Sequence, residues 1–194
     1  MKRRYLLIAL GIAILVGIAG VAYAAFADRG DVKGTSISVG SADIKLLVGL
    51  AGGTTESNLA DELNGPVFED IGATWEDDYL VKLFNNSSSQ VLLASTAYYE
   101  TVNDPQDLRS IVNIEILSWV DANSDGVLDV GELGTSYGKK TIVKWKTEGF
   151  DLPNMDSGAV AGFVLRFSAD NITDSKQGSQ LVFDFGFDAE GLEE

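Results

Sequence analysis

The sequence predicts an all-β fold, an antiparallel jelly roll or β-sandwich with few short helices, preceded by an N-terminal apolar leader helix. Polar and apolar residues alternate in several short segments, as they do in half-buried strands. Clusters of Gly, Asn, Asp and Ser separate these segments and are typical of turns. No segment after the leader has a convincing helical period, so the strands must bury their apolar faces against each other.

The first 27 residues have the pattern of a secretory leader. Met1–Arg4 is basic, Tyr5–Ala27 carries no charge, and small residues crowd the end of that run. Ala22-x-Ala24 offers a cut between Ala24 and Ala25, and Ala25-x-Ala27 offers one before Asp28. A basic tip, an apolar stretch and an Ala-x-Ala exit define a signal peptide. We therefore expect residues 1–24 to be removed and the mature protein to be extracellular or at the cell surface.

Two other interpretations of the leader remain. The uncharged run of about 23 residues is long enough to span a bilayer and could stay as an anchor. A type IV pilin-like leader would be cut before the apolar run, but it usually has Gly where Tyr5 follows the basic tip. We favour cleavage, which limits membrane contact to the leader before it is cut.

The mature chain is expected to form one domain. Residues 25–40 precede a sandwich over 41–188, and an acidic tail over 189–194 is expected to fray. A short helix is expected over 56–62, where Thr55 could cap it. The predicted strands are 35–39, 42–48, 79–84, 91–102, 111–119, 141–145, 159–167 and 180–187.

The composition excludes several functions. The leader holds three of the 14 basic residues, so 11 basic residues face 29 acidic ones in the mature chain, a formal charge of −18. Such a surface repels nucleic acids. The chain has no Cys and no His, which rules out disulfides, Ser-His-Asp or Cys-His catalysis, and the usual zinc sites. We expect no enzyme, because carboxylate-only chemistry has no positive support.

A twelve-residue segment fits a calcium-binding loop. It begins at Asp121, has Gly126 at its sharp turn, and ends at Glu132. The loop pattern D-x-[DN]-x-[DN]-G-x5-E is matched at every defined position. Oxygen ligands with this spacing suit calcium. The expected ligands are Asp121, Asn123, Asp125, the backbone carbonyl of Val127, Asp129 and Glu132.

The context of this loop departs from an EF-hand. A strand is predicted before it, and Gly131 and Gly134 weaken any helix after it. The alternative is a solvated acidic β-turn, because Asn-Ser-Asp-Gly favours turns. We expect a structural calcium ion that orders the loop and offsets part of the acidic repulsion.

Smaller signals concern modification and the core. Asn85, Asn86 and Asn171 each begin an N-glycosylation acceptor tripeptide. The three tryptophans and the C-terminal phenylalanines are expected in the core rather than in a ligand site.

Five segments together resemble the TasA/camelysin family. Ala22–Asp28 is similar to that family's leader exit, and Gly40–Leu46 is similar to its first strand. Tyr79–Ser87 resembles its strand that ends in an Asn-Asn turn. The pair 162–168 and 180–187 resembles its closing strands.

This resemblance implies a jelly-roll subunit of extracellular fibres, such as biofilm matrix fibres or archaeal bundling pili. The N-terminal segment of one subunit would be a donor strand that completes its neighbour's sheet, with Phe26, Val32 and Ile37 as candidate anchors. The partner would be the protein itself, and other matrix or pilus subunits could join. An open sheet edge can accept such a strand. The alternative is a monomeric secreted or membrane-anchored adhesin or binding module stabilised by calcium.

Overall fold

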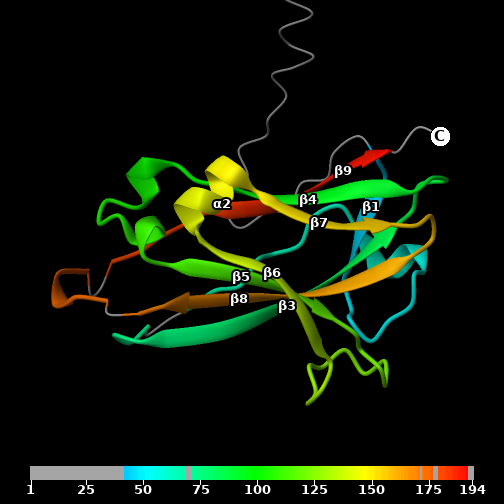
Figure 1. The fold of residues 1–194 in the computed structure, drawn as a ribbon, viewed down its shortest axis with the longest axis horizontal. Coiled ribbons are helices and arrows are strands. Elements are labelled where there is room, and N and C mark those ends of the chain that lie inside the picture. Colours follow the sequence, from blue (N-terminus) through cyan, green and yellow to red (C-terminus); the bar gives the residue numbers. More distant parts are fainter. Residues whose placement is uncertain (1–41, 69–70, 171, 177–178, 192–194) are drawn as a thin grey trace, which may run out of the picture. The chain divides into compact units, whose positions relative to one another are not determined.

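Two antiparallel β-sheets pack face to face in the computed structural model, which describes residues 42–68, 71–170, 172–176 and 179–191 (Figure 1). The predicted all-β class is confirmed. The leader, the strand over 35–39 and the candidate donor segment lie outside the described residues. The strands are β1 (Ile44–Leu47), β2 (Leu59–Ala60), β3 (Trp75–Asn85), β4 (Val91–Tyr98), β5 (Asn113–Trp119), β6 (Leu133–Thr141), β7 (Phe150–Met155), β8 (Val160–Ala169) and β9 (Asp184–Gly191).

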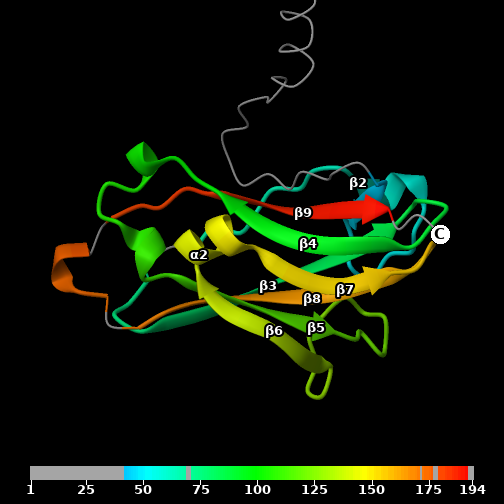
Figure 2. The same cartoon turned by 45° about the horizontal axis from the view of Figure 1, so that its top comes forward.

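The two sheets differ in width. The larger has six strands in the order β2-β1-β3-β8-β5-β6, and the smaller has three in the order β7-β4-β9. Every pairing is antiparallel. Figure 2 shows β9, β4 and β7 as one layer over β3, β8, β5 and β6. The short helix α2 (Ile142–Glu148) lies at one end of the sandwich.

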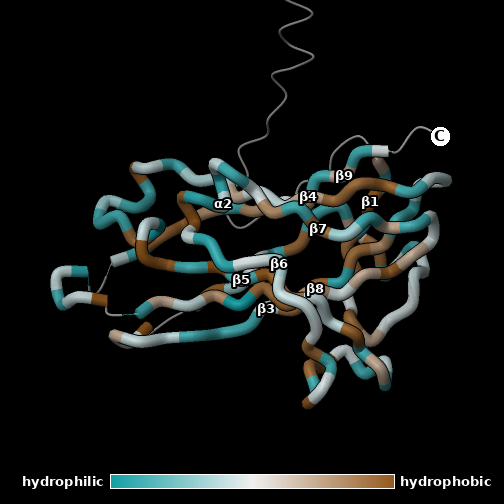
Figure 3. Tube along the Cα trace, in the orientation of Figure 1, coloured by the Kyte–Doolittle hydropathy of each residue, from teal (hydrophilic) through white to brown (hydrophobic). Residues whose placement is uncertain are grey.

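The main core fills the space between the sheets. Phe163, Leu165 and Phe167 of β8 face Phe185 and Phe187 of β9, and all five are at most 2% exposed. Their rings pack in tilted and stacked pairs, such as Phe163 on Phe187 at 6.0 Å between centroids. Hydrophobic stretches along β4, β8 and β9 are visible in Figure 3. Alternation along strands such as β4 and β5 therefore places one apolar face inward, as predicted.

The strand predicted over 141–145 is wrong, because this segment forms α2. Thr141 is its N-cap, and the Thr141 Oγ1 accepts a hydrogen bond from the Lys144 backbone N–H at 3.2 Å. Ile142 and Trp145 lie one helical turn apart and are both fully buried. The Trp145 indole N–H donates to Ser95 Oγ at 3.2 Å, which satisfies the polar end of a ring enclosed by the core.

Other boundaries also differ from the prediction. The helix expected over 56–62 is only the 3-10 turn η1 (Glu56–Asn58), and Thr55 makes no side-chain cap before it. Strands β2, β6 and β7 are not among the predicted strands: β2 falls inside the segment expected to be helical, and β6 is an edge strand with little apolar alternation. β9 starts four residues later than expected and runs three residues into the expected tail, where Ala189 is buried.

A second, smaller core covers the outer face of the six-stranded sheet. It consists of Leu117, Trp119 and Val164, each at most 7% exposed, with Leu80, Leu50, Leu128 and Leu133 packed around them. Leu50 follows β1, and Leu128 lies in the loop between β5 and β6. Gly162 is required here, because a Cβ at this position would lie 2.6 Å from the Trp119 carbonyl oxygen. Loop residues therefore form a covering layer over part of the outer face of this sheet.

The four outer strands of the described sheets differ as hydrogen-bonding edges. β2 has two residues. β6 contains Gly138 at φ +113°, two neighbouring lysines and two register shifts against β5. β7 contains Pro153, which has no N–H, and a register shift against β4. β9 pairs with β4 through eight consecutive residue pairs without a shift. Short length, bulges, Lys and Pro block strand addition, so β9 is the long regular edge.

Phe185→Ala tests the importance of the β9 side of the main core. The substitution should lower the free energy of unfolding by about 3–5 kcal/mol, because the Phe185 ring is fully buried. Val182→Ala, which changes a side chain that is 36% exposed, should cost less than about 1 kcal/mol. Urea unfolding followed by tryptophan fluorescence measures both. Equal losses in the two variants would contradict this account of the core.

Candidate functional site

The segment predicted to bind calcium is the loop between β5 and β6, which we call the acidic loop (residues 121–132). Backbone hydrogen bonds close its base: the Val120 N–H donates to the Glu132 carbonyl at 3.0 Å, and the Glu132 N–H donates to the Asp129 carbonyl at 3.2 Å. The two ends of the loop are thus held together by the ladder of the β5–β6 hairpin.

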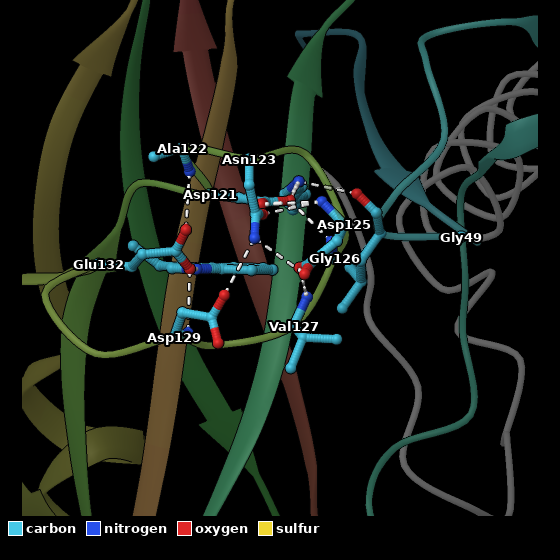
Figure 4. Close-up of polar contacts among 12 residues, drawn as sticks. Gly49, Asp121, Ala122, Asn123, Asp125, Gly126, Val127, Asp129 and Glu132 are labelled. Atoms are coloured by element: carbon cyan, nitrogen blue, oxygen red, sulfur yellow. Dashed lines mark hydrogen bonds and ion pairs between the residues drawn. The ribbon is translucent and has the colours of Figure 1, made fainter.

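Backbone N–H groups organise the first half of the acidic loop around Asp121. Its Oδ1 accepts from the Asp125 N–H at 3.1 Å, and its Oδ2 accepts from the Gly126 N–H at 2.9 Å (Figure 4). Gly126 has φ +76°, and a Cβ there would lie 2.6 Å from the Ala51 nitrogen. Glycine is therefore needed both for the turn and for the close approach of residues 50–51.

Glu132 organises the second half of the acidic loop. Its Oε1 accepts from the Ala122 N–H at 2.9 Å, and its Oε2 accepts from the Asp129 N–H at 3.0 Å and from the Trp119 indole at 3.1 Å. The residue is 8% exposed. The last predicted ligand therefore links both ends of the loop to the second core.

The Asn123 amide lies between two carboxylates in the centre of the acidic loop. Its Nδ2 donates to Asp125 Oδ2 at 2.9 Å and to Asp129 Oδ2 at 3.0 Å, and Figure 4 shows it pointing toward both. The positive end of the amide dipole thus separates two negative groups that would otherwise repel. Val127 contributes its N–H, which donates to Asp125 Oδ1 at 2.8 Å.

The donor set fits calcium in its chemistry, but its carboxylates do not converge on one point. Asp, Asn and Glu oxygens in this order are hard ligands that suit calcium. However, no group of three or more His, Cys, Asp or Glu side chains that could hold a metal occurs in the described part of the chain. Asp121 and Glu132 are instead directed at N–H groups and at a lysine. In this conformation the loop is closed by hydrogen bonds.

The same contacts lower the pKa of both terminal carboxyls of the acidic loop. The pKa of Asp121 falls chiefly because of the hydrogen bond from Lys82, with further help from the Gly126 N–H. The pKa of Glu132 falls because its carboxylate accepts from the Asp129 N–H and then from Trp119. Hydrogen bonds to an ionised carboxylate stabilise that form.

Lys82 of β3 anchors the acidic loop to the sheet. Its ammonium lies 2.6 Å from Asp121 Oδ2, donates to the Leu50 carbonyl at 2.7 Å, and sits 4.8 Å from the centre of the Trp119 ring. The two charged side chains are 12% and 2% exposed. The sequence motif gave no hint of this partner, because Lys82 is 39 residues from Asp121 and alternation only placed it on a strand.

The candidate glycosylation sites differ in accessibility. The Asn85 side chain is fully buried, and its amide donates to the Ser89 and Met155 carbonyls at 2.9 Å each. A glycan on Asn85 is therefore incompatible with this fold. Asn86 is exposed and donates to Asp43. Asn171 lies outside the described residues, as do Ala24, Ala25 and the donor anchors Phe26, Val32 and Ile37.

An apolar groove opens at the end of the sandwich where β9 begins. It has a volume of about 570 Å³ and runs between residues 64–68 and 179–183. Phe68, Trp75, Phe167 and Phe183 line much of it. The sequence did not single out this groove, because its lining comes from separate parts of the chain. Among the described residues, no helix is long and apolar enough to cross a membrane.

Comparisons of the chain with protein-family models, with curated proteins and with solved structures found no match.

Lowering the pH should weaken the contribution of Glu132 to stability. Because its folded-state pKa is lowered, this contribution is present above the unfolded-state pKa of about 4 and is lost as pH falls through the folded value. The difference in unfolding free energy between wild type and Glu132→Gln should therefore be largest near neutral pH and shrink below about pH 4. Denaturant titrations at several pH values measure it, and a difference that grows on acidification would contradict the assignment.

Proposed function

We propose that this chain is a structural subunit of an extracellular filament, which polymerises head-to-tail when the N-terminal segment of one subunit pairs with β9 of the next. The observation that carries the proposal is a contrast among the four outer strands of the described sheets. β9 has a long, regular edge, whereas β2 is short, β6 is bulged, and β7 has a register shift and a proline. Such an edge is a template for another strand. A contact of this kind does not close on itself and so builds a fibre.

The unequal sheets support the same proposal. The smaller sheet has three strands against six in the larger one. A donor strand beside β9 would widen the smaller sheet to four and bring the domain closer to the jelly roll that the sequence suggested. The apolar groove next to the start of β9 offers a place for apolar anchors such as Phe26, Val32 and Ile37.

The length of the N-terminal segment is sufficient for this role. Residues 25–41 could span up to about 56 Å when extended, whereas pairing along the eight residues of β9 needs about 26 Å. Cleavage of the leader near Ala24 would release this segment from the bilayer. The proposal therefore makes signal-peptide removal the step that permits assembly.

We also assign a structural calcium ion to the acidic loop as part of this proposed function. The support is the ordered set of oxygen side chains and the N–H pattern around Asp121 and Glu132. Asp121, Asn123, Asp125, Asp129, Glu132 and the Val127 carbonyl would hold the ion, which would supply positive charge to a strongly acidic chain. A closed loop would keep the second core covered.

Removing the donor segment should abolish polymerisation without unfolding the sandwich. The mature chain from Ala25 should form long fibres in negative-stain microscopy, and a chain that begins at Val39 should remain monomeric in size-exclusion chromatography. Val32→Pro in the mature chain should also block assembly, because proline cannot donate a ladder hydrogen bond. An unchanged melting temperature controls for folding. Fibres formed by the chain that begins at Val39 would contradict the donor-strand mechanism.

Calcium should raise the melting temperature of the protein. For an affinity typical of extracellular sites, 5 mM calcium would add about 1–2 kcal/mol, or roughly 2–8 °C, relative to EDTA. The double substitution Asp125→Ala and Asp129→Ala should remove this shift. Asp151→Ala, at an exposed carboxylate on β7, should retain it. Differential scanning calorimetry measures these melting temperatures. A calcium-dependent rise that remains in the double variant would place the ion elsewhere.

The second candidate is a monomeric binding module stabilised by calcium. The observation in its favour is the exposure of Val120, Val127 and Val130 at and beside the acidic loop, where each is more than half exposed. Exposed apolar side chains often mark contact surfaces. Persistent monomers of the mature chain at high concentration would favour this function over the filament.

A further inference from the structure

We infer that the end of the sandwich that carries α2, which we call the α2 end, is the surface that receives the next subunit. Its lysines bind carboxylates at the base of that subunit's N-terminal segment, by which we mean residues 42–43 and 156–157. This inference rests on the proposed filament and goes beyond it, because it identifies which ends of two copies meet. It also gives the donor strand a direction, antiparallel to β9.

Lysines that lack an ion pair gather at the α2 end. In the described part of the chain, four lysines make no ion pair: Lys139, Lys144, Lys146 and Lys176. Every other basic side chain described has a carboxylate partner. Lys144 and Lys146 lie on α2, and Lys176 ends the 3-10 turn η4 (Asp174–Lys176) that follows β8 (Figure 1). These charges are therefore free to attract carboxylates from outside the subunit.

Main-chain carbonyls hold two of these lysines in place without neutralising them. The Lys146 ammonium donates to the Tyr99 carbonyl at 3.0 Å and lies 4.3 Å from the centre of the Tyr99 ring. The Lys176 ammonium donates to the Asp107 carbonyl at 3.2 Å. A carbonyl accepts one of the three ammonium protons and leaves the positive charge intact. Lys144, on the same helix as Lys146, is exposed.

The base of the N-terminal segment carries a carboxylate without a basic partner. The Asp43 N–H donates to Ser87 Oγ at 2.9 Å, and Ser157 Oγ donates to the Ser87 carbonyl at 2.6 Å. The start of β1 therefore lies beside residue 157. The neighbouring Asp156 is exposed, and among the described residues its carboxylate contacts the Gln90 amide at 2.5 Å and no basic side chain.

The lysines and this carboxylate are too far apart to interact within one subunit. β8 runs from Val160, four residues after Asp156, to Ala169, five residues before η4 begins. Ten residues of strand span about 33 Å, whereas charges in physiological salt are screened within about 8–10 Å. They can meet between subunits, because a head-to-tail contact brings the base of one copy to the α2 end of another.

This contact sets the direction of the donor strand. β9 begins opposite Tyr98, at the α2 end, and finishes opposite Val91. With the base of the next subunit at the α2 end, its N-terminal segment runs antiparallel to β9, as all the described strand pairs do. Ile37 then lies toward the start of β9, beside the apolar groove, and Phe26 lies toward its end.

The critical concentration for fibre formation by the mature chain, measured by sedimentation, tests the charge contact. Lys144→Glu should raise it about fivefold, and Asp156→Lys should raise it by a similar factor, because each turns an attraction between subunits into a repulsion. Both changes in one chain should bring it back toward the wild-type value. Lys139→Glu is the matched control, at a lysine opposite Glu115 on the larger sheet, and should change it less than about twofold.

General repulsion between acidic subunits predicts a different pattern. Asp156→Lys makes the chain less acidic, so it would then lower the critical concentration. That result, no recovery in the combined variant, or an equal effect of Lys139→Glu would overturn the lysine contact and leave the filament standing. Absence of fibres from the wild-type mature chain would overturn both proposals. Lys146→Glu replaces Lys144→Glu if melting temperatures show that the latter does not fold.

Crosslinking tests the direction of the donor strand. The chain has no cysteine, so Ser38→Cys in one preparation and Val182→Cys or Glu190→Cys in another supply single thiols. A short bifunctional maleimide should link position 38 to position 182 in mixed fibres and not to position 190, which lies about 26 Å further along the extended chain. Links to position 190, alone or with 182, would overturn the antiparallel direction. Links to neither position would contradict pairing along β9 itself.

Discussion

The structure depends on one constraint: the middle of strand β8, residues 163–165, is buried on both faces. Phe163 and Leu165 point into the main core, and Val164 between them is fully buried on the opposite face. In a two-layer sandwich the outer face of each sheet is normally exposed to water, so the apolar residues on this outer face need a covering layer. Residues around Leu50 and Leu128 provide it.

The need for this covering layer explains the polar contacts around the acidic loop. A loop that covers apolar surface must satisfy its own polar groups, and the carboxylates of Asp121 and Glu132 accept the N–H groups that its sharp turns leave free. Lys82 and Trp119 connect those carboxylates to the sheet below. Closure of the loop and burial of the second core therefore depend on the same contacts.

The main core and the sheet edges are built from different kinds of residue. Without cysteine, the stability of this acidic chain rests on burial between the sheets, where aromatic rings from β8, β9 and α2 meet. The edges of β6 and β7 carry lysines, a proline and bulges, whereas β9 is regular. Among the described outer strands, β9 therefore has the longest uninterrupted register with its neighbour.

The sequence by itself determined the strand-rich class, most of the buried faces and the acidic loop, because period-two alternation and ligand spacing are local properties. It misassigned 141–145, where a capped turn with Ile142 and Trp145 on one face favours a helix. It could not locate β6, whose exposed position removes alternation, nor rule out Asn85 as a glycan site. Tertiary structure alone decided that Lys82 meets Asp121 and that β9 is an outer strand of the smaller sheet in the described part of the chain. Both depend on which strands become neighbours, and pairing between distant segments leaves no local pattern in a single sequence.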